Sequence, residues 1–199
     1  MSLAERKRRL VSNELTEAAL QLLAVKGFDA VTVDEIVAAA GVSKRTFFRY
    51  FASKEDVVVQ FLADMGTGIR AELAARPAQE TPSESLRHAI SVPIAACGDH
   101  SERALRVVQL ILRTPALHAR FLERQAQWRD ELAQELTTRT GPDAGLYPQL
   151  AAGMTLTAFD AVLQRWSDSD GSEDPTELTS QAFAVIAPAL DQPATGRSR

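Results

Sequence analysis

The sequence has a single cysteine among its 199 residues. One cysteine excludes a disulfide bond within the chain and a zinc site built on cysteines. No stretch approaches the roughly 18 consecutive apolar residues of a membrane-spanning helix, and the N-terminus lacks the apolar core of a secretory signal. These absences are typical of a protein of the reducing cytoplasm, which is where we expect this chain to act, without a membrane segment.

The patterns that mark enzymes are missing as well. The three histidines have no carboxylates at metal-ligand spacing, and no glycine-rich phosphate loop is present. Nothing resembles a nucleophile beside its base. We therefore expect no catalytic residues, no bound metal and no cofactor.

Alternation of apolar and polar residues, which is typical of β-strands, is scarce. Apolar residues recur instead at helical spacing, and this predicts an all-α protein of about nine helices. The expected helices cover about residues 8–26, 33–40, 44–50, 54–75, 83–97, 101–113, 116–139, 146–167 and 175–190. We expect an N-terminal domain over residues 1–53, a C-terminal domain over 54–191 and a disordered tail over 192–199.

Charge is distributed unevenly along the chain, whose formal net charge is −4. Residues 1–54 hold nine Lys or Arg against six Asp or Glu, a balance of +3. Residues 55–199 hold thirteen against twenty, a balance of −7. A basic head on an acidic body suits a protein that presents one end to phosphates, although chance variation in a solvated surface is the alternative.

Residues 32–56 carry the strongest signal in the sequence. Thr32 is a good N-cap, and Glu35 three residues later completes a capping box. Gly41 stands where a helix ends in the left-handed conformation, and Ser43 can cap a second helix. A helix, a short glycine-containing turn and a second helix form the helix-turn-helix arrangement, whose second helix can enter the DNA major groove.

Several short blocks in about residues 8–60 together resemble the N-terminal domain of the tetracycline-repressor (TetR) family. The blocks are AALQLL at 18–23, KGF at 26–28, TVDEI at 32–36, GVS at 41–43, TFFRYF at 46–51 and SKE at 53–55. Members of that family are homodimeric transcriptional regulators, usually repressors, whose variable C-terminal domain binds a small effector. The resemblance therefore implies a homodimer that responds to a ligand.

The second helix of the motif places Phe47 and Phe51 on its apolar side. Recognition helices contact base edges mainly with their N-terminal residues. Lys44, Arg45 and Thr46 are accordingly predicted to contact bases, since Arg or Lys can donate to guanine and the Thr methyl can meet a thymine methyl. A solvated cationic face is the alternative for the two cations.

Five residues are predicted to lie against DNA phosphates. Thr32 and Ser43 stand at helix N-termini, where free N–H groups point outward. Lys54 matches a family position that commonly reaches the DNA backbone. Phe48 stands where the family often has tyrosine, so the hydroxyl contact is missing there, and Tyr50 is expected to supply it unless it only packs.

A compact basic cluster, formed by Arg6, Lys7, Arg8 and Arg9, precedes the first expected helix. We expect it to follow phosphates or to enter the minor groove as a flexible arm. A solvated, disordered tail is the alternative.

The last two long helices, about 146–167 and 175–190, stand where the family builds its four-helix dimer interface. Packing within one chain is the alternative for some of their apolar residues. The predicted interface residues are Phe159, Val162, Trp166, Phe183 and Ile186.

An effector pocket is expected among the segments from 55 to 166. Ordinary core or surface positions are the alternative for each lining residue, and an apolar or aromatic molecule is the expected ligand. The lining candidates are His88, Cys97, Phe121, Trp128 and Met154.

Taken together, these patterns predict a sequence-specific DNA-binding regulator. The most consistent form is a repressor that binds an inverted repeat in double-stranded DNA as a dimer and is released by a small molecule. Activation remains open, because it depends on the position of the operator. The alternative is a helical protein–protein interaction module, which would leave Lys44, Arg45, Arg49 and Tyr50 without a role.

Overall fold

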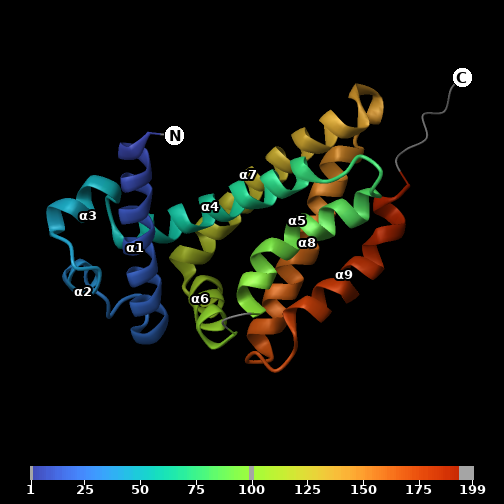
Figure 1. Ribbon diagram of the computed structural model, residues 1–199. Helices are drawn as coiled ribbons and strands as arrows, with labels where there is room; N and C mark the ends of the chain where they lie inside the picture. The colour runs from blue at the N-terminus through green and yellow to red at the C-terminus, as the bar shows by residue number, and fades with distance from the viewer. Residues whose placement is uncertain (1, 99–100, 193–199) are drawn as a thin grey trace, which may run out of the picture. The chain divides into compact units, whose positions relative to one another are not determined.

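The computed structural model describes residues 2–98 and 101–192, apart from the side chains of residues 3–5, 96–98, 101 and 142 (Figure 1). Within those ranges it contains nine α-helices, one 3₁₀ turn and no strand, which confirms the all-α class. The helices are α1 Leu3–Lys26, α2 Val33–Ala39, α3 Lys44–Tyr50, α4 Lys54–Ala75, α5 Pro82–Gly98, α6 Ser101–Arg113, α7 Pro115–Thr140, α8 Tyr147–Asp168 and α9 Pro175–Leu190, with the 3₁₀ turn η1 at Pro142–Ala144.

Most helix boundaries lie within a residue or two of the sequence expectation, but α1 begins earlier. The sequence predicted a start near Arg8 and a flexible arm before it, whereas α1 begins at Leu3. The four basic residues Arg6–Arg9 are therefore helical, which corrects the expectation of a flexible arm. No proline or glycine precedes residue 27, so nothing in the sequence stops the helix from extending toward the N-terminus.

The chain divides into two compact units. One comprises Met1–Ala63 and Arg106–Phe121, and the other comprises Asp64–Leu105 and Leu122–Arg199. The compact units divide inside α4, whereas the functional boundary predicted after residue 53 stays a prediction. Residues 193–199, most of the predicted disordered tail, lie outside the described residues. Within the described ranges, every helix falls short of the length or hydropathy that a membrane crossing needs.

The first unit is organised around side chains from α1 to α4 that are fully removed from solvent. Figure 1 shows α1, α2 and α3 grouped at the N-terminal end of the chain, and α2 packs against both α1 and α3. Short helices of this kind depend on such packing, because isolated helices of fewer than about 12 residues are marginal in water. The residues buried most completely here are Leu15, Ala19, Leu23, Ile36, Phe47, Val57 and Val58.

The second unit has its core between α5, α8 and α9, which pack against one another. Phe159 and Trp166 of α8 and Phe183 of α9 are buried in this core. Hydrogen bonds between segments that are far apart in the sequence also hold this unit together. Ser83 at the start of α5 donates through its N–H and hydroxyl to the Asp191 carboxylate, at 2.9 and 2.7 Å. The hydroxyl of buried Tyr147 donates to the Leu190 carbonyl at 2.7 Å.

Arg139 of α7 satisfies the carbonyl groups at the C-terminal end of α4. Its guanidinium donates to the carbonyls of Leu73, Arg76 and Pro77, each at 3.0 Å, and to the Ser85 hydroxyl at 3.2 Å. The last carbonyls of a helix have no partner within it. This arginine therefore fixes the end of α4 and the loop that follows.

Gly66 of α4 lies against the indole ring of Trp128, and its substitution should show how tightly the two pack. A Cβ on Gly66 would lie 1.9 Å from Trp128 Nε1, whereas a Cβ on Gly68 would meet nothing within 4 Å. We expect Gly66→Ala to lower the free energy of unfolding by roughly 1–3 kcal/mol through overpacking. The control Gly68→Ala should raise it by up to about 1 kcal/mol, because alanine favours helix. Urea unfolding followed by circular dichroism measures both, and equal shifts would contradict this packing.

Candidate nucleic-acid interface

The first helix of the motif, α2, begins with the predicted capping box. The N–H of Glu35 donates to the Thr32 hydroxyl at 3.3 Å, and the Glu35 carboxylate accepts from the Thr32 N–H at 2.9 Å. Lys26 adds an ion pair to the same carboxylate at 2.7 Å. The cap therefore holds three chain segments together: the end of α1, the loop and the start of α2.

The turn after α2 depends on a residue without a side chain. Gly41 has φ +64°, a left-handed conformation that favours glycine. The N–H of Val42 donates to the Val37 carbonyl at 3.0 Å and closes the helix end. The predicted left-handed conformation of Gly41 is thus confirmed. The turn is short, and the next helix has its N-cap at Ser43.

The second helix, α3, is anchored by its aromatic residues. Ser43 caps it by accepting a hydrogen bond from the Thr46 N–H at 3.1 Å. Phe47 and Phe51 are buried, and their ring centroids lie 5.6 Å apart. Phe48, in contrast, is exposed and offers no hydrogen-bonding group. Burial of one side of α3 leaves its other side to solvent.

The three predicted base-contacting residues lie in different environments. Lys44 is exposed and pairs with the exposed Asp34 at 2.8 Å. Arg45 is exposed, and no described residue pairs with its guanidinium. Thr46 is half-buried, and its hydroxyl shares a hydrogen bond with the Ser43 hydroxyl at 3.0 Å. Their contacts with DNA stay predictions.

Among the predicted phosphate contacts, Lys54 has a second role that the sequence did not reveal. Its ammonium donates to the carbonyls of Phe28 and Val31, at 2.6 and 3.0 Å, and lies 4.4 Å from the centre of the Phe28 ring. Lysine has three N–H donors, so one remains for a phosphate. Thr32 and Ser43 use their hydroxyls in the caps, and their helix N–H groups are the donors that face outward.

Two arginines lie close to the ring of Tyr50, at the end of α3. The Arg49 guanidinium carbon lies 5.1 Å and that of Arg8 lies 6.0 Å from the centre of the Tyr50 ring. Arg49 also makes a long hydrogen bond of 3.4 Å to the Tyr50 hydroxyl. Arg49 was absent from the predicted contacts because sequence spacing does not show which cation meets which ring.

The predicted effector-pocket residues are scattered between core and surface. Phe121 and Trp128 are buried, and Trp128 lies 6.5 Å from the Phe159 ring, centre to centre. His88 and Met154 are partly exposed, and the side chain of Cys97 lies outside the described part of the structure. These five positions stay predictions.

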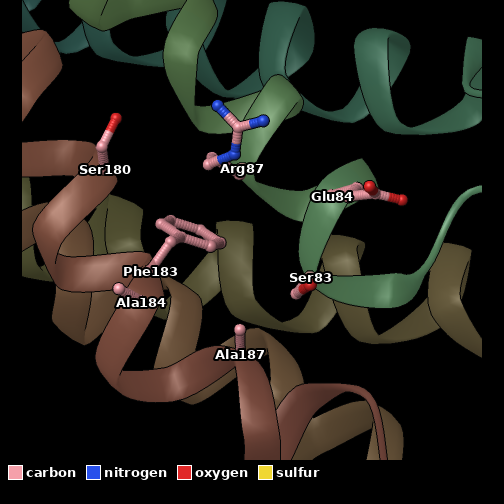
Figure 2. Close-up of a pocket in the computed structure, with 7 residues that line it drawn as sticks. All are labelled: Ser83, Glu84, Arg87, Ser180, Phe183, Ala184 and Ala187. Carbon is pink, nitrogen blue, oxygen red and sulfur yellow. The ribbon is translucent and has the colours of Figure 1, made fainter.

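A pocket of about 190 Å³ opens between α5 and α9, and none of the five predicted effector-pocket residues lines it. Figure 2 shows its lining residues: Ser83, Glu84 and Arg87 from α5, with Ser180, Phe183, Ala184 and Ala187 from α9. The sequence carried no signal for this pocket, because its residues come from two segments that lie 93 to 104 positions apart in the chain.

Four of the predicted dimer-interface residues belong to the core of a single chain. The exposed fractions of Phe159, Val162, Trp166 and Phe183 are 1%, 4%, 1% and 3%. A side chain that is buried in its own chain cannot offer its surface to a partner, so these four positions are corrected to core. Ile186 is partly exposed and stays a candidate.

Other apolar residues in or next to α8 and α9 are exposed, and these are not among the five predicted interface residues. Leu146 precedes α8, Leu150 lies in its first turn and Val185 lies in α9; their exposed fractions are 74%, 60% and 80%. A helical stripe identifies apolar positions, but their exposure becomes visible only in three dimensions.

Two known protein families match the N-terminal and the C-terminal parts of the chain. Residues 15–61 match the family described as "Bacterial regulatory proteins, tetR family". Residues 80–191, more than half of the chain, match the "MftR C-terminal domain". The match at the N-terminus covers the whole of α2 and α3.

Two curated relatives have the same level of identity. The chain is 32% identical over 196 residues to the transcriptional regulator MftR of Mycobacterium tuberculosis, covering 94% of each protein. It is 32% identical over 147 residues to the HTH-type transcriptional regulator TcmR of Streptomyces glaucescens, covering 71% of this chain and 65% of that protein. The chain thus spans slightly under two thirds of the length of TcmR.

A solved structure shows the same fold. The transcriptional regulator FadR of Bacillus subtilis, in complex with stearoyl-CoA, has a TM-score of 0.66 and 24% identity, covering 87% of this chain and 96% of that one. At this identity, the likeness concerns the fold alone.

The ionisation of Glu35 offers a test of the cap that orients α2. Hydrogen bonds from Lys26 and Thr32 lower the pKa of Glu35 from 4.5 to about 2. Because the pKa is lower in the folded state, the cap stabilises the fold above pH 4.5, and this contribution is lost as the pH falls toward about 2. Lys26→Gln should therefore raise the pKa of Glu35.

Carbon-detected NMR titration of the Glu35 carboxyl measures this change. Lys44→Gln is the matched control, because it removes the same charge from a lysine that pairs with Asp34. It should leave the pKa of Glu35 near 2. A wild-type midpoint near the ordinary value of 4.5 would contradict the capping geometry.

Proposed function

This chain belongs to the TetR family of bacterial regulatory proteins and is a DNA-binding transcriptional regulator; we propose that it acts in the cytoplasm as a homodimeric repressor. In this proposal it binds an inverted-repeat operator, and a small molecule bound by residues 54–191 releases it from the DNA. The regulators that it resembles support this assignment.

The observation that carries the proposal is the exposed side of α3. Buried Phe47 fixes the rotation of the helix, so Arg45 extends into solvent without a carboxylate partner among the described residues. Lys44 lies beside it and is held only by an exposed ion pair, which contributes little because solvent screens it. Both cations are thus available to donate to guanine O6 and N7 in the major groove.

A dimer follows from the size of this helix. One seven-residue helix offers too few contacts for a typical operator affinity. Two copies related by a two-fold axis would present two such helices about one turn of DNA apart, which requires an inverted repeat. Selection from random duplexes at near-physiological salt, read by sequencing, tests this directly. Enrichment of one inverted repeat is expected, and enrichment of no sequence would overturn the proposal.

We place the dimer contact on the exposed apolar residues of α8 and α9. Leu150 and Val185 are 60% and 80% exposed although both are aliphatic. Large apolar side chains exposed on adjacent helices mark interaction surfaces. Partly exposed Ile186 belongs to α9 as well, so the one remaining predicted interface residue is compatible with this placement.

Effector binding is assigned to the C-terminal part of the chain because that part matches the MftR C-terminal domain. His88, Cys97, Phe121, Trp128 and Met154 remain the proposed lining. FadR holds stearoyl-CoA, a ligand with a long apolar chain, and an apolar effector is our proposal here too. In linkage terms, the effector releases DNA by binding more tightly to the form of the dimer that cannot engage both half-sites.

Arg45→Ala tests base reading by α3. Loss of a bidentate contact should cost roughly 1–3 kcal/mol and relax the preference at one base position in each half-site. The measurement is a repeat of the duplex selection with the variant, together with its affinity for the wild-type operator. Arg70→Ala, which removes an exposed arginine of α4 outside the motif, should leave the sequence preference intact. An unchanged profile for Arg45→Ala would remove Arg45 from the set of base contacts.

Charge substitutions on α8 and α9 test the dimer surface. Leu150→Asp and Val185→Asp should each yield folded monomers of 21.7 kDa in light scattering coupled to gel filtration, because a carboxylate would be buried unpaired in the interface. Val25→Asp is the matched control, since Val25 is 63% exposed on α1. It should remain dimeric. Dimers that persist in both α8 and α9 variants would place the interface elsewhere.

A further inference from the structure

The C-terminal end of α3 carries an arrangement that base reading does not explain. Two arginines from different helices lie over the ring of Tyr50: Arg49, its neighbour in α3, and Arg8 of α1. Their guanidinium carbons lie 5.1 and 6.0 Å from the centre of the Tyr50 ring. The ring is half-buried and both arginines are exposed. In Figure 1, α3 lies near the N-terminal part of α1.

Within the described side chains, these two arginines have no carboxylate close enough to balance their charge. Among the described side chains, no carboxylate forms an ion pair with Arg8 or Arg49. Each guanidinium is attracted to the electron-rich face of the ring, but the two positive charges repel each other. Such an arrangement becomes favourable when an anion joins it, because one negative charge would then compensate both cations.

We propose that Arg8, Arg49 and Tyr50 form a clamp for a single backbone phosphate of bound DNA. This proposal rests on the DNA-binding function proposed above. A phosphodiester has two non-bridging oxygens, and each guanidinium can donate two parallel N–H groups to them. The Tyr50 hydroxyl accepts from Arg49 at 3.4 Å, and its own proton is free to be donated to the phosphate.

The position of the clamp along α3 fits a groove edge. From Lys44 to Tyr50 the helix rises by about 9 Å, at about 1.5 Å per residue, and the major groove of B-DNA is about 12 Å wide. When the N-terminal residues of α3 reach base edges, its C-terminal end therefore lies near a phosphate strand. The C-terminal end of a helix carries negative partial charge and repels phosphates. Two cations at this end offset that repulsion.

The clamp also explains why α3 can bind the backbone without a hydroxyl at residue 48. Phe48 is exposed in the same helix but has no donor. Tyr50 is the sole tyrosine of α3, and it both donates and orients two cations. Because Arg8 already rests on the ring, little rotamer freedom remains to be lost when DNA binds.

The salt dependence of DNA binding tests the clamp. For B-DNA, each neutralised phosphate contributes about 0.9 to the slope of log K against log salt. A dimer has two clamps, so the double variant Arg8→Gln/Arg49→Gln should reduce the slope by about 1.8. The probe is a duplex carrying the inverted repeat that the selection enriches, titrated by fluorescence anisotropy at several salt concentrations. Circular dichroism confirms that each variant is folded.

Three single variants separate the clamp from a diffuse basic patch. Arg70→Gln removes the same charge from an exposed arginine of α4 outside the motif, and should keep the wild-type slope. Tyr50→Leu keeps both arginines but removes the ring that orients Arg8, and should lose most of the slope that the double variant loses. Tyr50→Phe keeps the ring and should retain most of it.

The possible outcomes are distinct. A wild-type slope in the double variant would overturn the clamp and leave the regulatory function intact. A wild-type slope in Tyr50→Leu would overturn it in favour of a diffuse patch. A loss of about 3.6 in the double variant would mean that the arginines hold separate phosphates, which also overturns it. Wild-type protein that binds no duplex would refute the regulatory function itself.

Discussion

The burial of Phe47 is the constraint on which the interface depends. α3 has seven residues, and a helix of that length is not stable in water without tertiary packing. Phe47 is fully removed from solvent, so α3 exists because its aromatic side is part of the core of the first unit. Residues are about 100° apart around a helix; fixing Phe47 inward therefore directs Arg45 and Arg49 outward. The same contact that stabilises the helix sets what it presents.

Local signals in the sequence predicted the helices and their ends, because these depend on residues close together in the chain. The capping box at Thr32 and the turn at Gly41 are of this kind. Four apolar residues of α8 and α9 were predicted to meet a partner chain, whereas they are buried within their own chain. Periodicity shows that Phe159 and Phe183 need an apolar neighbour, and it cannot show whether that neighbour belongs to the same chain. Contacts such as Arg139 with the end of α4, 62 to 66 residues apart, have no local signal at all.

The distribution of ion pairs separates structural charges from functional ones. Glu35 is held by Lys26 and by the Thr32 cap, so its charge is committed to the orientation of α2. Lys54 is committed in a similar way to two main-chain carbonyls. Lys44 shares an exposed pair with Asp34, and such a pair contributes at most about 1 kcal/mol. It can exchange Asp34 for a DNA base or phosphate at little cost, whereas breaking the Lys54 contacts would disturb the loop before α2.

Because Arg6–Arg9 are helical, they have less conformational freedom to lose on DNA binding than a flexible arm would have. A flexible arm would lose conformational freedom on binding, at roughly 1–2 kcal/mol per ordered residue for the backbone alone. Because these residues already lie in α1, that loss accompanies folding rather than binding. The consequence is geometric as well. A flexible arm adapts to any nearby phosphate, but a cation fixed on a helix can meet a phosphate only where the recognition helix has settled in its groove. The same rigidity that preserves affinity therefore couples the backbone contact of α1 to correct docking of α3.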